Sequence, residues 1–134
     1  MRHVVGLPPA PTSPRDARLF VSHWTRQWGY QRLLGPVALL TSELATNAVL
    51  HAGTSFEVSA TNLGSGVRVT VWDGSPAAPA VRDPAKVDAT GRGLRLVDSI
   101  SAHWGWERDP DRGGKQVWFE LDAASPMGDS EPAG

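Results

Sequence analysis

The sequence predicts an α+β domain, a two-layer α/β sandwich in which helices cover one face of a mixed, mostly antiparallel sheet. Two observations lead to this prediction. Apolar residues recur at helical spacing up to residue 53, and from residue 56 they alternate with polar residues, as is typical of strands. The strands come in pairs joined by short turns, and hairpins of this kind build antiparallel sheets.

Two amphipathic helices are expected before the first of these hairpins. Ser13 is expected to cap the first helix, with Pro14 at its first helical position. The apolar stripe of this helix comprises Ala17, Phe20, Val21, Trp24 and Trp28. The second helix is expected over residues 36–52, with Gly53 as its stop. Its apolar stripe comprises Val37, Leu40, Leu44 and Ala48.

Two β-hairpins are expected in the second half of the chain. The first pairs residues 56–60 with 67–71, and the second pairs residues 103–106 with 116–121. Between them, residues 74–90 contain three prolines and scattered charges, which predicts a loop. A third helix is expected after this loop, because apolar residues again recur at helical spacing.

The length and composition limit the number of domains and the classes to which the protein can belong. A chain of 134 residues is expected to hold one domain, over residues 14–122. Residues 1–13 are expected to be an N-terminal tail or edge segment, and residues 123–134 a disordered C-terminal tail. The absence of cysteine excludes a disulfide framework and a cysteine nucleophile, and a net charge of −1 argues against direct nucleic-acid binding. With neither a membrane span nor a signal peptide evident, a cytoplasmic protein is expected.

One edge of the second helix carries polar side chains. Because a step of four residues rotates the helix by only about 40°, Glu43, Asn47 and His51 are expected to lie along one line beside the apolar stripe. An amide and a carboxylate placed there could hold a hydrated Mg²⁺, and Glu43 could deprotonate a hydroxyl. The alternative is a solvated face with a local hydrogen bond.

Asp73 ends a strand and shares its face with the apolar residues of that strand. Its carboxylate is therefore expected at the rim of an apolar surface, where it could accept a hydrogen bond from the exocyclic amine of a base. The alternative interpretation is structural, because Asp-Gly after a strand also forms turns.

Gly91-Arg92-Gly93 precedes the third expected helix. Backbone N–H groups at a helix start bind phosphate, and glycines allow a close approach. The pattern fails the dinucleotide-binding fingerprint, because Leu96 stands at the third glycine position and no parallel β-α-β pattern surrounds it.

In this order, the three signals resemble the histidine-kinase-like ATPase family, whose Bergerat ATP-binding fold is shared with gyrase. The motifs are Ser42-Glu43-Leu44-Ala45-Thr46-Asn47 on a helix, Val69-Thr70-Val71-Trp72-Asp73 on a strand, and Thr90-Gly91-Arg92-Gly93 before a helix. The resemblance covers residues 14–122. More narrowly, the sequence resembles the small stand-alone anti-sigma-factor serine kinases within this family.

The resemblance implies a role for each matching residue. Asn47 would ligate Mg²⁺ bound to the ATP phosphates, Glu43 would be the general base toward an accepting serine, and Asp73 would receive the adenine amino group. Backbone amides of Gly91, Arg92, Gly93 and Leu94 would wrap the phosphates, with residues 74–90 as a lid. The implied partners are a sigma factor and an antagonist protein that is phosphorylated on serine, and a homodimer is expected by analogy.

The sequence departs from the family pattern at two places. Relatives often carry a glycine two residues after the adenine-binding aspartate, where this chain has Gly74-Ser75-Pro76, and they commonly place threonine before the final strand, where it has Gln116 after Lys115. Two further functions stay open. One is a nucleotide-responsive binding module without kinase activity. The other is a nucleotide-free interaction protein that docks through its tryptophan-rich sheet and the segment with Arg15, Arg18, Arg26 and Arg32.

Overall fold

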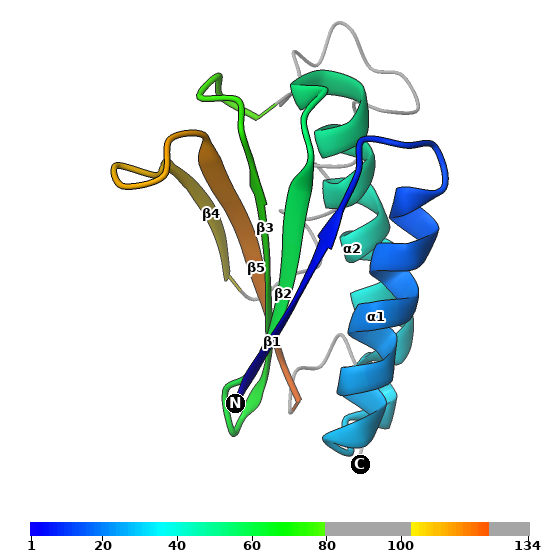
Figure 1. Cartoon of the computed structure of the whole chain (residues 1–134). Helices are drawn as coiled ribbons and strands as arrows, with labels where there is room; N and C mark the ends of the chain where they lie inside the picture. The colour runs from blue at the N-terminus through cyan, green and yellow to red at the C-terminus, as the bar shows by residue number, and fades with distance from the viewer. Residues whose placement is uncertain (80–102, 124–134) are drawn as a thin grey trace, which may run out of the picture.

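The computed structural model describes residues 1–79 and 103–123, which form two layers (Figure 1). One layer is an antiparallel sheet with the strand order β1-β2-β3-β5-β4. Its strands are β1 (Arg2–Leu7), β2 (Phe56–Asn62), β3 (Gly66–Asp73), β4 (His103–Arg108) and β5 (Lys115–Asp122). The helices α1 (Ser13–Gln27) and α2 (Leu34–Asn47) cover one face of this sheet. The predicted α+β sandwich is therefore confirmed.

Short helical turns flank α2 on both sides. A 3-10 turn, η1 (Gln31–Leu33), leads into it, and a π-helical turn, η2 (Ala48–Ala52), continues it. Gly53 ends the run in the left-handed conformation at φ 67°, which a residue without a Cβ adopts at little cost. The predicted stop at Gly53 is confirmed, although the last turn is wider than an α-helix.

The N-terminal residues form an edge strand. Sequence analysis left a tail or an edge segment open for residues 1–13, and β1 pairs antiparallel with β2 along its length. From this strand the His3 ring stacks on the Trp24 ring of α1, with a centroid separation of 3.4 Å and an interplanar angle of 3°. The stack joins the edge of the sheet to the helical layer.

The start of α1 differs in detail from the prediction. Ser13 is the first helical residue rather than the cap, and it is buried. Its hydroxyl donates to the carbonyl oxygen of Pro8 at 2.6 Å. Ser13 therefore closes the turn between β1 and α1, and Pro14 is the second helical residue rather than the first.

The core lies between the helices and one face of the sheet. Residues directly opposite each other in an antiparallel pair share a face, and the pairs Val71–Val117, Val69–Phe119 and Val67–Leu121 are all buried. The predicted stripe of α2 packs on them, because Val37, Leu40, Leu44 and Ala48 are buried as well. The apolar stripe predicted for the helix and the apolar faces predicted for the strands therefore meet in one core.

The helical run Gln31–Ala52 is 22 residues long and apolar enough to span a membrane by length and composition. Sequence analysis did not expect such a run. In this fold α2 packs against both α1 and the sheet, and much of its circumference faces other side chains. Burial on two sides accounts for the composition of this helix.

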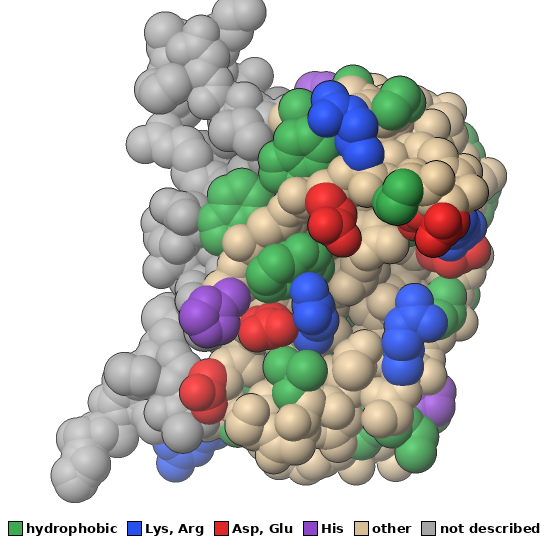
Figure 2. Space-filling model, turned by 90° about the vertical axis from the view of Figure 1, so that its left-hand side faces the viewer, with side chains coloured by type: hydrophobic (Ala, Val, Ile, Leu, Met, Phe, Trp, Pro, Cys, Tyr) green, Lys and Arg blue, Asp and Glu red, His purple; other side chains and the backbone are tan. Residues whose placement is uncertain are grey.

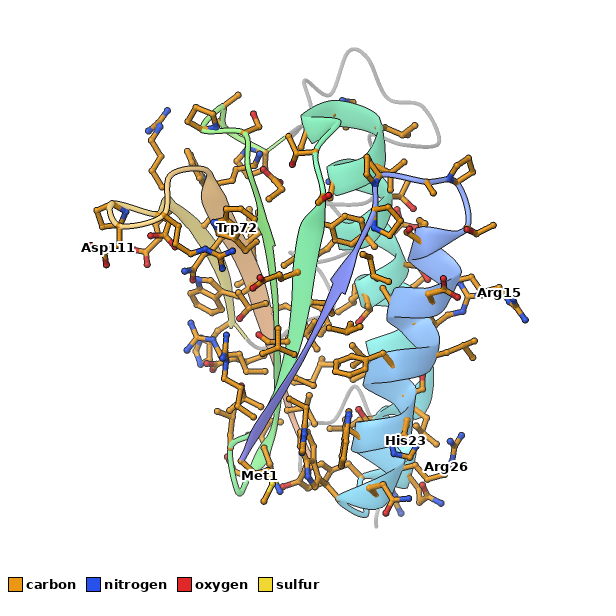
Figure 3. All side chains as sticks on the ribbon, viewed as in Figure 1. Met1, Arg15, His23, Arg26, Trp72 and Asp111 are labelled. Carbon is orange, nitrogen blue, oxygen red and sulfur yellow. The ribbon has the colours of Figure 1, made fainter. Side chains whose placement is uncertain are left out.

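The other face of the sheet is not covered by α1 or α2, and charged and apolar side chains alternate across it (Figure 2). Trp72 extends from this open face (Figure 3). The Arg112 guanidinium lies 3.7 Å from the Trp72 ring centroid and donates to both carboxylate oxygens of Glu57, at 2.9 and 3.1 Å. This guanidinium holds the pKa of Glu57 below its ordinary value. Arg68 lies over Trp118 in the same way, with 4.2 Å to the ring centroid.

The turn between β4 and β5 contains two adjacent glycines with positive φ. Gly113 lies at φ 80° with open space around it, whereas Gly114 lies at φ 75° against the end of β3. A Cβ on Gly114 would collide with the carbonyl oxygen of Asp73. The close approach of these two strand ends therefore requires glycine at position 114.

We expect Gly114→Ala to destabilise the protein by about 2–5 kcal/mol, from the positive φ together with the steric collision. The matched variant Gly113→Ala has only the strained φ and should cost about 1–2 kcal/mol. Urea unfolding of both variants, followed by tryptophan fluorescence, measures the difference. Equal losses would show that the backbones are not in close contact at Asp73.

Candidate functional site

A small cavity lies where the end of α2 meets the ends of β3 and β5, and residues 75–79 form its outer wall. Its volume is about 30 Å³, roughly the space of one water molecule. The helices contribute Leu44, Asn47, Ala48 and His51, and the strands contribute Val71, Asp73, Lys115 and Val117. The floor is thus apolar, and polar groups converge on it from four elements, α2, η2, β3 and β5.

Two of the predicted site residues meet in this cavity. Asn47 reaches it from the last residue of α2 and Asp73 from the last residue of β3. His51 lines it too, carried there by the π-helical turn. Sequence analysis placed Asn47 and Asp73 on separate elements, and the fold brings them to one place.

The Asp73 carboxylate is buried and paired with a lysine. Lys115 lies directly opposite Asp73 in the β3–β5 ladder, and its Nζ donates to Asp73 Oδ1 at 3.0 Å. The side chains are only 6% and 4% exposed for Lys115 and Asp73, respectively. Two charges this far from water stabilise each other only while both are present.

The outer wall is tied to this ion pair. The backbone N–H of Ser75 donates to Asp73 Oδ1 at 2.9 Å, and Lys115 Nζ donates to the carbonyl oxygen of Ser75 at 3.2 Å. Arg108 Nε donates to the carbonyl oxygen of Pro76 at 2.9 Å. The segment that differs from the family pattern, Gly74-Ser75-Pro76, is therefore held over the cavity by basic residues of β4 and β5.

The side-chain nitrogen of Asn47 has no partner in the part of the chain that the structure describes. This Nδ2 atom is buried and has no hydrogen-bond partner within residues 1–79 and 103–123. A buried polar atom without a partner costs stability, so such a group often serves a ligand. An amide oxygen can also coordinate Mg²⁺. The amide and the neighbouring carboxylate thus fit a nucleotide with its metal.

The remaining predicted site residues are not among the described residues that line the cavity. Glu43 lies one helical turn before Asn47 and is half-buried, but it is not among the described residues that line the cavity. Gly91, Arg92, Gly93 and Leu94, with the third expected helix, lie outside the described residues. Their roles stay predictions from the resemblance.

Lys115 was not among the predicted site residues. Gln116 was noted at the position where relatives place threonine, but it lies opposite Trp72 on the open face, and its Nε2 donates to Asp109 Oδ2 at 3.1 Å. Lys115 instead faces the cavity. Pairing the last strand of the first predicted hairpin with the last strand of the second would have identified Lys115, because the residue opposite Asp73 points to the same face of the sheet.

The chain matches the family model of the histidine kinase-like ATPase domain over residues 7–121. It belongs to this family. It is also similar to the crystal structure of the RsbU and RsbW domains of Rv1364c from Mycobacterium tuberculosis, with a TM-score of 0.69 and 17% sequence identity. That match covers 91% of this chain and 32% of the other, so it shows a shared fold over about a third of a longer protein. No curated protein matches the chain.

We expect Lys115→Met to destabilise the protein by about 3–5 kcal/mol, because it leaves the buried Asp73 carboxylate without its counter-charge. The double variant Asp73→Asn/Lys115→Met should recover part of this loss, since it removes both charges. Urea unfolding at neutral pH measures both. As a control, Arg112→Met breaks an exposed ion pair and should cost clearly less. A loss for Lys115→Met no greater than that of the control would contradict a buried ion pair.

Proposed function

We propose that this protein binds ATP with Mg²⁺ in the cavity between α2, β3 and β5, and that it regulates a sigma factor by sequestration and by phosphorylating a serine of an antagonist protein. The observation that carries the proposal is the meeting of the Asp73 carboxylate and the Asn47 amide in one cavity of a histidine kinase-like ATPase domain. The partners are inferred from the family resemblance, and the similarity to a structure with an RsbW domain supports them.

In this proposal Asp73 recognises the base. Its Oδ1 atom is engaged by Ser75 and Lys115, and its Oδ2 atom has no partner in the described part of the chain. A carboxylate oxygen on an apolar floor accepts a hydrogen bond from an amine with little competition from water. Asp73 is therefore suited to hold the adenine amino group.

The other end of the site handles the phosphates. Asn47 would bind Mg²⁺ through its amide oxygen, and backbone amides of residues 91–94 would surround the phosphates. When bound, Mg·ATP supplies the transferable phosphoryl group and neutralises its charge. Glu43, one turn earlier on α2, would take the proton from the serine hydroxyl of a docked partner. Positioning of that serine is the main requirement, because phosphoryl transfer needs little covalent help.

A binding module without kinase activity remains the second candidate. The wall at Ser75 and Pro76 is held by Lys115 and Arg108, so a nucleotide must rearrange it on entry. Such a rearrangement by itself can change the affinity for a partner protein, provided that the partner distinguishes the two arrangements.

We expect calorimetric titration with ATP and Mg²⁺ to show saturable binding, which Asp73→Asn weakens by about 10- to 100-fold through the loss of a charged acceptor. Asn47→Ala should weaken binding when Mg²⁺ is present and have less effect with EDTA, because its contact is to the metal. Thr70→Ala, on the open face, is the control and should change neither.

If the wild-type protein fails to bind at millimolar ATP, the proposal is wrong and the fold serves as a protein-binding scaffold. If Asn47→Ala weakens ATP binding equally with and without Mg²⁺, Asn47 does not bind the metal.

We expect Glu43→Ala to reduce phosphoryl transfer to a candidate antagonist by about 10²- to 10⁴-fold, as for loss of a general base. Nucleotide affinity should hardly change, since Glu43 does not line the described cavity. Transfer from labelled ATP to the antagonist is the assay, with Glu43→Gln as the isosteric companion. Transfer that survives both substitutions would rule out Glu43 as the base. Binding of ATP by the wild type without transfer to any antagonist would favour the binding module.

A further inference from the structure

We propose that Lys115 is a second base-contacting residue of this site, and that it donates a hydrogen bond to the ring nitrogen next to the amino group held by Asp73. This inference rests on the proposed function, because it requires an adenine nucleotide in the cavity. It adds a specificity determinant next to Gln116, the position at which the family resemblance leads one to expect threonine.

The two side chains are held in a defined arrangement. Asp73 and Lys115 are cross-strand partners in register on β3 and β5, and both line the cavity. Their ion pair of 3.0 Å is buried on both sides. A donor and an acceptor are therefore presented side by side by two adjacent strands rather than by a loop.

Among the described residues, each partner has one hydrogen-bonding position that is not used. Within residues 1–79 and 103–123, Lys115 Nζ donates to Asp73 Oδ1 and to the carbonyl oxygen of Ser75, whereas an ammonium has three N–H groups. Asp73 Oδ2 likewise accepts nothing from these residues, since Ser75 and Lys115 both bind Oδ1. The pair thus offers a single acceptor beside a single donor.

This pattern matches the pairing edge of adenine. That edge carries an amine donor next to a ring-nitrogen acceptor, so Asp73 Oδ2 accepts from the amine while Lys115 donates to the ring nitrogen. Guanine presents one acceptor followed by two adjacent donors. Only one carboxylate oxygen is available, so one N–H of guanine would be buried without an acceptor, which lowers affinity.

Entry of a base also explains how Lys115 changes partners. The cavity of about 30 Å³ is water-sized, so a purine enters only if the wall at residues 75–79 moves outward. That movement breaks the bond from Lys115 to the Ser75 carbonyl oxygen. The ring nitrogen then replaces this oxygen as acceptor, so the buried ammonium makes as many hydrogen bonds with the base bound as it does without it.

The test compares ADP with 1-deaza-ADP, which keeps the amine but has a C–H in place of the ring nitrogen. In calorimetric titrations we expect the wild-type protein to bind 1-deaza-ADP about 10- to 100-fold more weakly than ADP, the loss typical of a charged hydrogen bond. This comparison needs no variant, so it stands even if Lys115 variants fold poorly. Lys115→Met, checked for folding by circular dichroism, should bind the two nucleotides with equal affinity.

The control Arg68→Met removes a positive charge from the open face and should retain the wild-type preference for ADP. Three outcomes overturn the inference. These are equal binding of both nucleotides by the wild type, a preference that persists in Lys115→Met, and tighter ADP binding by Lys115→Met, which would make the lysine an obstruction. If the wild type binds ADP and shows no preference, only the inference fails. If it binds neither nucleotide, the proposed function fails as well.

Discussion

The pairing of β3 with β5 determines both the core and the site. In this register Val71 and Val117 are buried against α2, and one step along the same face Asp73 meets Lys115. A slip of one residue would reverse every side chain on one strand, because successive residues of a strand point to opposite faces. Apolar burial therefore enforces the position of the ion pair. The chemistry of the cavity depends on a register that the hydrophobic core selects.

Much of the fold followed from periodicity in the sequence. The two helices and the two hairpins were predicted because apolar spacing reports which face an element buries, and those faces do meet in one core. The N-terminal strand was less certain, because a short edge strand next to prolines has a weak pattern and gains its pairing from β2. Ser13 was misplaced as a cap because its hydroxyl bonds to Pro8, a partner that local rules do not consider.

The site residues, like the elements of the fold, could be predicted from the sequence only in part. Asn47 and Asp73 were candidates from their places beside apolar faces, the family resemblance selected them, and the fold brings them into one cavity. Lys115 could not be chosen by the same rule, because its position depends on pairing with a strand over 40 residues earlier in the chain. Local pattern thus identified the residues on single elements, whereas partners contributed across the sheet required the topology.

The π-helical turn at Ala48–Ala52 has a consequence for the evolution of this site. Its backbone bond from Gly53 to Ala48 spans five residues instead of four, so the turn contains the equivalent of one inserted residue. Loss of one residue here would convert this wide turn into an ordinary α-helical turn. Asn47 and the buried stripe precede the turn and would keep their places, whereas His51 lies inside the turn and reaches the cavity from it. The turn lets the end of the helix vary in length without disturbing the core.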